Sequence, residues 1–233
     1  MLSQRSSEKE QMDNFNLSGI ELNKTLNGLF TINKYLGNTA TTLKAVKKEI
    51  LKAKKPLKII DLGCGGGDNL RAIATWCKVN NKPVELLGID GNLHILKYAE
   101  NQNNPSSVIK YLNADILNSD FVLPTCDILI SSHFMYHFSD TEIVEFLKKS
   151  KNSISTKIIF SELHRSPFAY LLFKIGAVFL PFSSIVKQDG LAAIRRAFNK
   201  KELMAILEKA EFTEYQINWK WAFRYLILIT PKN

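Results

Sequence analysis

After Pro56 the sequence alternates between short apolar runs rich in β-branched residues and longer segments in which apolar residues recur every three or four positions. Short runs of this kind predict buried strands, and the longer amphipathic segments predict helices. The expected strands are Leu57–Leu62, Val84–Asp90, Val108–Leu112, Ile128–Ser131 and Ile154–Phe160. The expected helices between them are 67–79, 93–100 and 141–150, the last capped by Ser139 or Asp140. This alternation predicts an α/β fold, in which a parallel sheet carries helices on both faces.

Helical segments flank this alternating region on both sides. Between Gly19 and Lys55 apolar residues at helical spacing predict two helices, separated at Gly37 and Asn38, which both tolerate a left-handed helix end. After Glu162 three helical segments precede any further strand, and they span 167–180, 190–197 and 200–210. The strands 214–220 and 222–230 then close the chain as a hairpin. We expect a seven-stranded, mostly parallel sheet in residues 56–233, a helical insertion at about 166–211, and residues 1–55 as a helical extension that forms a lid.

Composition narrows the class of protein. With 233 residues, of which 45% are hydrophobic, the chain can bury one substantial core. The three cysteines, Cys64, Cys77 and Cys126, lack the spacing of a zinc site or of a disulfide framework. The polar N-terminus has no apolar stretch typical of a secretory signal. The longest apolar run, 168–182, is too short to span a bilayer and is interrupted by Lys174. We therefore expect a cytoplasmic protein without a transmembrane segment.

The chain carries a formal net charge of +9, which raises the question of a nucleic-acid partner. Lysine pairs such as Lys47-Lys48 and Lys148-Lys149 lie close to acidic residues at helical spacing. That pattern is typical of solvated helix faces rather than of one basic groove. A nucleic-acid partner is therefore not expected.

A glycine-rich turn joins the first expected strand to the helix after it, with the sequence Asp61-Leu62-Gly63-Cys64-Gly65-Gly66-Gly67-Asp68-Asn69. Glycines at such a turn let a ligand approach the backbone, and the N–H groups at the start of a helix favour an anionic group. Dinucleotide-binding proteins have a similar turn, in which the pyrophosphate lies against the helix. Here Asp61 and Asp68 flank the glycines and would repel a pyrophosphate. Two carboxylates suit a ligand that carries an ammonium group and a sulfonium centre.

The turn resembles the first motif of the class I S-adenosylmethionine-dependent methyltransferases, which has the pattern acid-x-Gly-x-Gly-x-Gly. Asp61, Gly63, Gly65 and Gly67 match that pattern. The resemblance implies a Rossmann-like sheet, S-adenosylmethionine as cofactor and S-adenosylhomocysteine as product. It also implies that the loop holds the methionine part of the cofactor, with Asp61 near its amino group. The cofactor-binding residues expected in this loop are Asp61, Gly63, Cys64, Gly65, Gly67, Asp68 and Asn69.

Three later segments occur in the order that this family shows. Asp90 ends the second expected strand, where the family places an acid against the ribose hydroxyls, and an ionised carboxylate can accept both hydrogen bonds. Asp115 and Ile116 follow the third strand, where the family contacts the adenine. Taken singly, Asp90 and Asp115 could instead cap a helix or a turn. The fourth strand ends at Ser131, beside which the family places the transferring methyl group. The resemblance therefore adds Asp90, Gly91, Asn92, Asp115, Ile116 and Ser131 to the expected cofactor-binding residues.

Segments at both ends of the chain resemble a narrower group, the bacterial small-molecule methyltransferases of polyketide- and quinone-type pathways. These segments are 29–37, 162–170 and 186–190. The resemblance implies a small, largely apolar acceptor, such as a phenol, a quinol or a polyketide-like molecule, with O-methylation favoured over C-methylation. An RNA or protein methyltransferase is an alternative that only the charge supports. A catalytically silent module that binds the cofactor is another.

A hydroxyl acceptor must lose a proton, and histidine suits the role of base near neutral pH. His133, His137 and His164 follow the fourth and fifth expected strands, beyond whose ends the ligand crevice of such a sheet lies. These three are the candidate catalytic residues, as a base or in positioning the acceptor, although each could equally have only a structural role. His94 is expected at the surface or at the cofactor's edge. With Glu162 the three histidines could bind a metal, but their spacing gives little support, and no metal is expected.

The apolar segment Pro167–Leu180 has two functional interpretations. It can roof the acceptor pocket together with the N-terminal helices, which would make that pocket apolar and aromatic. Alternatively it can contact a membrane surface, because Lys174, Lys187, Arg195 and Arg196 are near it in the sequence. We favour the roof and keep peripheral membrane contact as the alternative. The chain is expected to act as a monomer or a homodimer.

Overall fold

The computed structural model describes residues 2–103, 108–179 and 182–231. Its centre is a seven-stranded sheet in the order β3-β2-β1-β4-β5-β7-β6. The first five strands are parallel, and β7 runs antiparallel to both β5 and β6. The strands are β1 (Leu57–Leu62), β2 (Val84–Asp90), β3 (Ile109–Asn113), β4 (Cys126–Ser132), β5 (Ile154–Leu163), β6 (Tyr215–Lys220) and β7 (Arg224–Ile229). The expected Rossmann-like α/β fold is confirmed.

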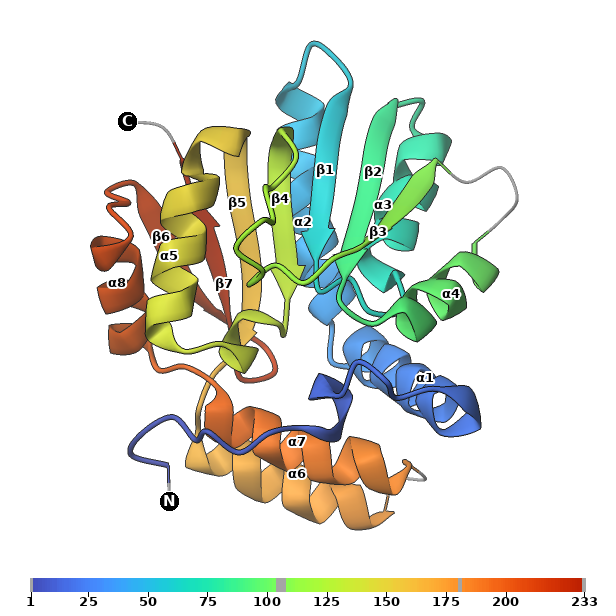
Figure 1. The fold of residues 1–233 in the computed structure, drawn as a ribbon, viewed down its shortest axis with the longest axis vertical. Coiled ribbons are helices and arrows are strands. Elements are labelled where there is room, and N and C mark those ends of the chain that lie inside the picture. Colours follow the sequence, from blue (N-terminus) through green and yellow to red (C-terminus); the bar gives the residue numbers. More distant parts are fainter. Residues whose placement is uncertain (1, 104–107, 180–181, 232–233) are drawn as a thin grey trace.

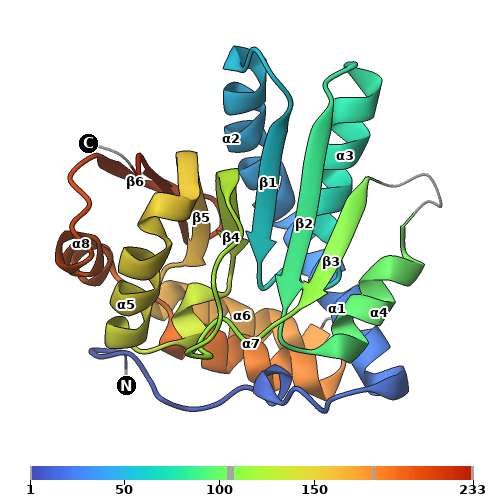
Figure 2. The ribbon, with the colours of Figure 1, turned by 45° about the horizontal axis from the view of Figure 1, so that its top comes forward.

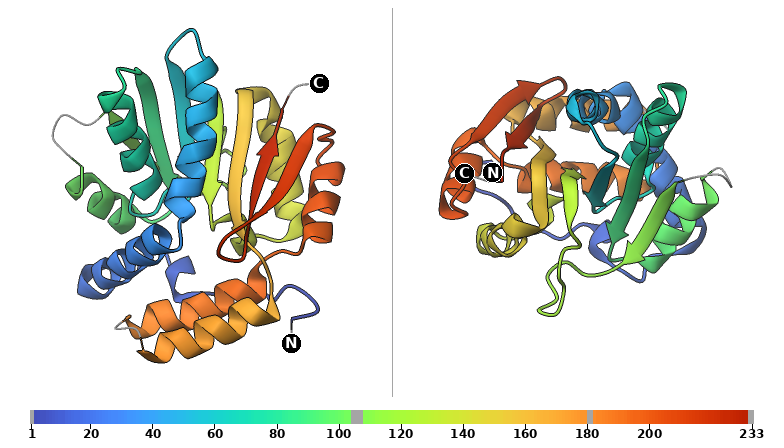
Figure 3. Two further views of the ribbon diagram at one scale, coloured as in Figure 1. Left: turned by 180° about the vertical axis from the view of Figure 1, so that it is seen from behind. Right: turned by 90° about the horizontal axis from the view of Figure 1, so that it is seen from above.

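Helices cover both faces of the sheet (Figure 3). α2 (Asn38–Lys52) and α3 (Asp68–Val79) lie on one face, and α5 (Asp140–Ser150) and α8 (Lys200–Lys209) lie on the other. Neighbouring strand residues alternate between the two cores: Ile59 packs with the residues under α2 and α3, and Ile60 packs with those under α5 and α8. Because both faces are buried, the strands are almost continuously apolar, as expected for a parallel sheet.

The parallel strands all end at one edge of the sheet, and the remaining helices gather beyond that edge (Figures 1 and 2). They are α1 (Gly19–Tyr35), α6 (Pro167–Phe179) and α7 (Ser184–Arg196), with α4 (Leu93–Asn101) beside β3. The short helices η1 (Gln11–Asp13) and η2 (Met135–His137) lie in the same region, and η3 (Lys151–Ser153) follows α5. The N-terminal segment, residues 2–17, runs along α7 toward α1 (Figure 1), and η1 contacts α7.

The start of one helix differs from the sequence prediction. α7 begins at Ser184 rather than at Gly190, because the Ser183 side chain accepts a hydrogen bond from the N–H of Val186 and caps the helix. Gly190 lies inside that helix, where a Cβ atom would come within 2.2 Å of the Phe173 ring of α6. Close packing between α6 and α7 therefore requires a glycine at a position that looked like a helix start.

The helical insertion is divided between two places. α8 packs beside α5 on the sheet, whereas α6 and α7 pack on each other beyond the strand ends. Much of α6 is exposed, including Phe168 at 72% and Phe179 at 82%. Leu180, the last residue of one expected helix, lies outside the described residues. Within the described ranges, no helix is long and apolar enough to cross a membrane.

Candidate active site

A large cavity of about 1200 Å³ lies where the parallel strands end. Its walls come from the loops after β1, β2, β3 and β4, from α1, α6 and α7, and from the N-terminal segment. A pocket for one drug-sized ligand typically has a volume of roughly 300–1000 Å³. The cavity therefore has room for two molecules side by side.

The glycine-rich turn forms one wall of this cavity. Gly63 and Gly65 both have left-handed backbone conformations, with φ of 60° and 52°. The Phe134 ring lies directly against Gly63, where a Cβ atom would come within 2.2 Å of it. Beside Gly65, in contrast, a Cβ atom would meet nothing within 4 Å. The backbone at Gly65 therefore faces open space, as a site for close ligand approach requires.

Asp61 and Asn69 provide buried acceptors without donors, and of the two only Asn69 lines the cavity. Neither carboxylate oxygen of Asp61 has a hydrogen-bond partner, although the residue is only 1% exposed. The Asn69 amide donates to the Ser132 hydroxyl at 3.1 Å, and its carbonyl oxygen is also buried without a partner. Burial, with the nearby charges of Asp90 and Asp68, raises the pKa of Asp61 well above its usual value. Such a set of acceptors fits an ammonium group, which has three donors and no acceptor.

Other residues nominated in this turn have local partners. Asp68 forms an ion pair with Arg71, which lies one helical turn further along α3. Cys64 lines the cavity, and burial raises the pKa of its thiol well above the usual range. Gly67 is the N-cap of α3 with φ of 80° and does not line the cavity. Cys64 and Asp68 are therefore at the cavity wall, whereas Gly67 shapes the turn.

Asp90 links the end of β2 to the turn that follows β1. One carboxylate oxygen accepts from the N–H of Gly65 at 3.1 Å, and the other accepts from the N–H of Asn92 at 3.0 Å. Burial raises the pKa of Asp90 despite these hydrogen bonds. Gly91 lines the cavity under the Phe15 ring. The Asn92 side chain accepts from the N–H groups of the first turn of α4 and caps that helix, and it donates to the Leu17 carbonyl oxygen at 3.1 Å. Both polar atoms of this side chain therefore already have partners within the protein.

The residues nominated after β3 and β4 differ in their placement. Asp115 and Ile116 both line the cavity, and the Asp115 carboxylate accepts from the N–H of Leu117 at 2.9 Å. Ser131 does not line it: its hydroxyl is fully buried and donates to the Leu62 carbonyl oxygen at 3.0 Å. Since successive residues of a strand point to opposite faces, the neighbouring Ser132 reaches the cavity instead.

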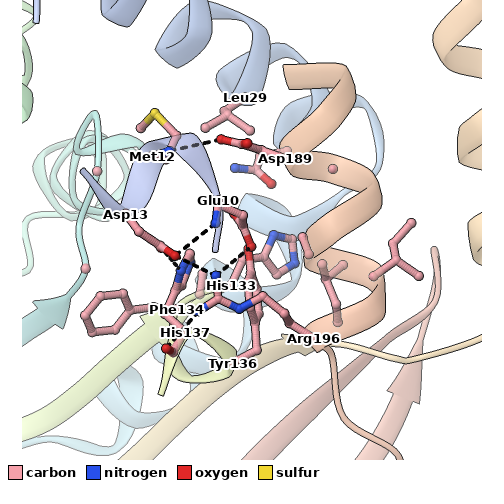
Figure 4. A pocket seen from close by; sticks show the side chains of 18 of the residues that line it. Glu10, Met12, Asp13, Leu29, His133, Phe134, Tyr136, His137, Asp189 and Arg196 are labelled. Atoms are coloured by element: carbon pink, nitrogen blue, oxygen red, sulfur yellow. Dashed lines mark hydrogen bonds and ion pairs between the residues drawn. The ribbon is translucent and has the colours of Figure 1, made fainter. Parts of the chain in front are cut away.

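All three candidate histidines line the cavity, but their surroundings differ. Burial and the nearby charge of Arg224 lower the pKa of His133 to about 3, so its ring is neutral. His164 packs against the Tyr225 ring at 4.9 Å, and burial lowers its pKa. Nδ1 of His137 lies 2.5 Å from a carboxylate oxygen of Asp13 (Figure 4). Of the three, His137 is the histidine that the structure pairs with an acid.

Asp13 belongs to a network that the sequence analysis did not detect (Figure 4). Its second oxygen accepts from Arg196 at 2.6 Å. Burial alone would raise the pKa of Asp13, but His137 and Arg196 outweigh it and hold that pKa well below the usual range. Burial raises the pKa of Glu10, 3.7 Å from Arg196, to about 9. Asp189 accepts from the N–H groups of Gln11 and Met12 at 2.9 and 3.1 Å, which fixes η1 over the cavity.

Glu162 supports the loop that carries His137. One of its oxygens accepts from the N–H groups of Phe134 and Met135 at 3.3 and 3.0 Å. Burial raises the pKa of this carboxyl to about 7. The residues that the structure describes include no cluster of three or more His, Cys, Asp or Glu side chains placed to hold a metal.

One family model and several curated proteins are similar to this chain. Residues 59–156 match a family model described as a methyltransferase domain. Over 176 residues the chain is 25% identical to the carboxy-S-adenosyl-L-methionine synthase of Campylobacter jejuni subsp. doylei, an alignment that covers 70% of this chain and 72% of that protein.

Two solved structures illustrate the similarity of fold. The plantazolicin methyltransferase BpumL, in complex with a monoazolic desmethylPZN analog and SAH, superposes with a TM-score of 0.64 at 16% identity over 88% of each chain. Human N-acetylserotonin methyltransferase, in complex with SAM, superposes with a TM-score of 0.63 at 14% identity over 97% of this chain and 63% of that one.

The sheet order and the ordered motifs around one cavity are those of a Rossmann-like methyltransferase fold, and residues 59–156 match a methyltransferase domain. The chain is an S-adenosylmethionine-dependent methyltransferase, and residues 59–156 form the core of its methyltransferase domain.

Proposed function

We propose that this enzyme transfers a methyl group from S-adenosylmethionine to an oxygen atom of a small, largely apolar acceptor. The cofactor supplies the electrophilic methyl group. On this proposal Asp61 and Asn69 accept from its ammonium group, the backbone at Gly65 lies against it, and Asp90 faces the ribose hydroxyls. Asp115 and Ile116 would lie at the adenine. The buried oxygens of Asp61 and Asn69 support this orientation, because within the described residues no hydrogen-bond partner satisfies them.

The observation that carries the proposal is the hydrogen bond between Asp13 and His137. A carboxylate at Nδ1 fixes the imidazole tautomer, so that Nε2 can accept a proton, and stabilises the imidazolium that forms. An acceptor hydroxyl needs such a base, and this is the reason for favouring O-methylation over C-methylation. We assign His137 as the base, Asp13 as its positioning residue, and His133 and His164 to the wall of the acceptor site.

The apolar part of the cavity is the proposed acceptor site. Its wall is formed by α1 and α6, and the side chains concerned are Leu26, Leu29, Ala169, Leu172, Phe173 and Ala177. Such a wall suits an aromatic or polyketide-like molecule better than a polar one. On this proposal the N-terminal segment and α1 act as the lid expected of residues 1–55, since both line the cavity, whereas α2, the rest of that extension, packs on the sheet. Because α6 also presents apolar residues outward, peripheral membrane contact stays the alternative role of its outer face.

The proposal is tested by incubating the enzyme with S-adenosylmethionine carrying a trideuterated methyl group and a panel of phenols and quinols. We expect one acceptor to gain a single trideuterated methyl on oxygen while S-adenosylhomocysteine accumulates. The curated relatives are named as carboxy-S-adenosyl-L-methionine synthases, so the masses of the nucleoside products are measured by mass spectrometry as well. A nucleoside heavier by a carboxyl group, formed when a carboxylic acid able to give up its carboxyl group is added to the incubation as the donor, would replace the proposal with that chemistry. Label on RNA or protein instead of the small molecules would assign the macromolecular alternative.

A further inference from the structure

Arg224 begins β7 at the edge of the sheet where the cavity lies, and its side chain forms part of the cavity wall. The residue is only 1% exposed, which makes it one of the largest fully buried side chains. Nη1 donates to the carbonyl oxygens of Leu36 and Trp221 at 2.7 and 3.0 Å. Nε is buried and has no acceptor.

No acid compensates this buried cation. Among the residues that the structure describes, no carboxylate forms an ion pair with Arg224, whereas Arg5, Arg165, Arg195 and Arg196 all have one. Burial lowers the pKa of Arg224 to about 10, and no neighbouring charge offsets that shift. A buried ion without a partner destabilises a protein by several kcal/mol or more, so such residues are rare without a ligand-binding role.

A structural role accounts for only part of this side chain. The bond from Nη1 to Leu36 satisfies a carbonyl group at the C-terminal end of α1, where a cation is also favoured by the helix dipole. The side-on fork of the guanidinium, formed by Nε and Nη2, makes no hydrogen bond within the described part of the chain. That fork matches the two oxygens of a carboxylate, which can accept both N–H groups in parallel.

Among the described residues, no charged group contributes to the pKa shift of Arg224. His133 lies close enough for the arginine charge to lower its pKa, and the neutral ring has a buried Nε2 without a partner. The loop before β7 adds Trp221 and Phe223 to the same wall of the cavity. This corner therefore offers a cation and apolar side chains to whatever occupies it.

The topology places this corner at a defined distance from the glycine-rich turn. β1 carries the turn, and β4 and β5 lie between β1 and β7. Three strand spacings therefore separate the end of β1 from the start of β7 by roughly 14 Å. His133, at the end of β4, lies between them. Because the proposed cofactor occupies the end beside the turn, the remaining distance to Arg224 suits an acceptor of one or two rings.

We propose that Arg224 binds a carboxylate on the acceptor, so that the substrate is an aromatic or polyketide-like acid whose reacting hydroxyl and carboxylate lie at opposite ends. This inference rests on the proposed function and adds the charge of the substrate to it. Arg224 determines specificity and takes no part in proton removal.

The test is isothermal titration in the presence of saturating S-adenosylhomocysteine with two matched pairs of probes. The pairs are 4-hydroxybenzoate with 4-hydroxybenzamide, and 6-hydroxy-2-naphthoate with 6-hydroxy-2-naphthamide. In the unmodified enzyme we expect the carboxylate of at least one pair to bind ten times more tightly than its amide or better. Arg224→Gln and Arg224→Met should reduce that ratio to about one, and Arg224→Lys should keep part of it. Arg195→Gln, which removes a positive charge outside the cavity, should leave it unchanged.

Equal affinity of carboxylate and amide in both pairs, or no binding of any probe while S-adenosylhomocysteine is bound, would overturn the inference and leave the proposed function intact. Failure to bind S-adenosylhomocysteine would instead contradict the proposed function. If the Arg224 variants do not fold, the ratio of carboxylate to amide affinity in the unmodified enzyme still tests the inference.

Discussion

At the scale of single residues, the position of the glycine-rich turn and of Asp90 could be predicted from the sequence, and the contact between Asp13 and His137 could not. Asp90 follows a strand in a fixed pattern, and the structure places its carboxylate on the neighbouring Gly65. Asp13 and His137 are 124 positions apart, and nothing local to either residue indicates that they meet. Ser131 was nominated one position from Ser132, because the sequence does not show which face of a buried strand each residue occupies.

The pair of Asp13 and His137 leads to a prediction about catalysis. His137→Gln should lower kcat by about 10²–10⁴, the usual contribution of a general base, and should leave affinity for S-adenosylhomocysteine unchanged. Asp13→Asn should lower kcat as well, because an amide no longer stabilises the imidazolium. Steady-state kinetics on the acceptor found in the labelling experiment measures both. The exposed His94→Gln is the matched control, and a normal kcat in His137→Gln would rule out His137 as the base.

At the scale of secondary structure elements, the strands and most helices follow from hydrophobic periodicity, whereas the N-terminal segment does not. Residues 2–17 contain little regular structure, and polar contacts rather than a periodic apolar face hold them in place. Their partners, Asp189 and Arg196, lie on α7, which is far along the chain. Closure of the cavity by this segment is therefore a property of the tertiary structure, and only the structure shows it.

The contacts of Asp189 lead to a prediction about the stability of η1. Asp189→Asn loses the charge-assisted acceptor for the N–H groups of Gln11 and Met12, and places an amide donor opposite one of them. Amide hydrogen exchange in the peptide containing these two residues should become at least about ten times faster, because η1 opens more often. The control Glu145→Gln removes a charge from the exposed face of α5. Unchanged exchange in Asp189→Asn would show that other contacts hold the segment.

Glu10 predicts a pH dependence of stability. Its pKa rises from an ordinary value of 4.5 to about 9 on folding, so between these pH values the folded chain retains a proton that the unfolded chain releases. Stability must therefore fall as pH rises through this range. Glu10→Gln cannot ionise. The difference in stability between this variant and the unmodified enzyme should therefore shift in favour of the variant when the pH is raised from 5 to 8.5. Thermal unfolding of both proteins at the two pH values measures this, and an equal difference at both would contradict a neutral Glu10.

At the scale of the whole molecule, the sheet brings the functional residues together because its parallel strands end at one edge. The loops after β1, β2, β3 and β4 meet there, and α1, α6 and α7 enclose the space that remains. The fold class could be predicted because alternation of strands and helices determines it. The division of the insertion could not, because the apolar residues of α6 and the amphipathic pattern of α8 do not show which surface each helix packs against.

The central claim is that this cavity binds S-adenosylmethionine through the glycine-rich turn and Asp90. Isothermal titration with S-adenosylhomocysteine tests it directly. We predict one binding site per chain, weakened about 10- to 100-fold by Asp90→Asn, as expected for loss of a charged hydrogen-bond acceptor, and unchanged by the exposed Asp120→Asn. No binding to the unmodified protein at about 1 mM S-adenosylhomocysteine, or equal affinity in Asp90→Asn, would contradict the account.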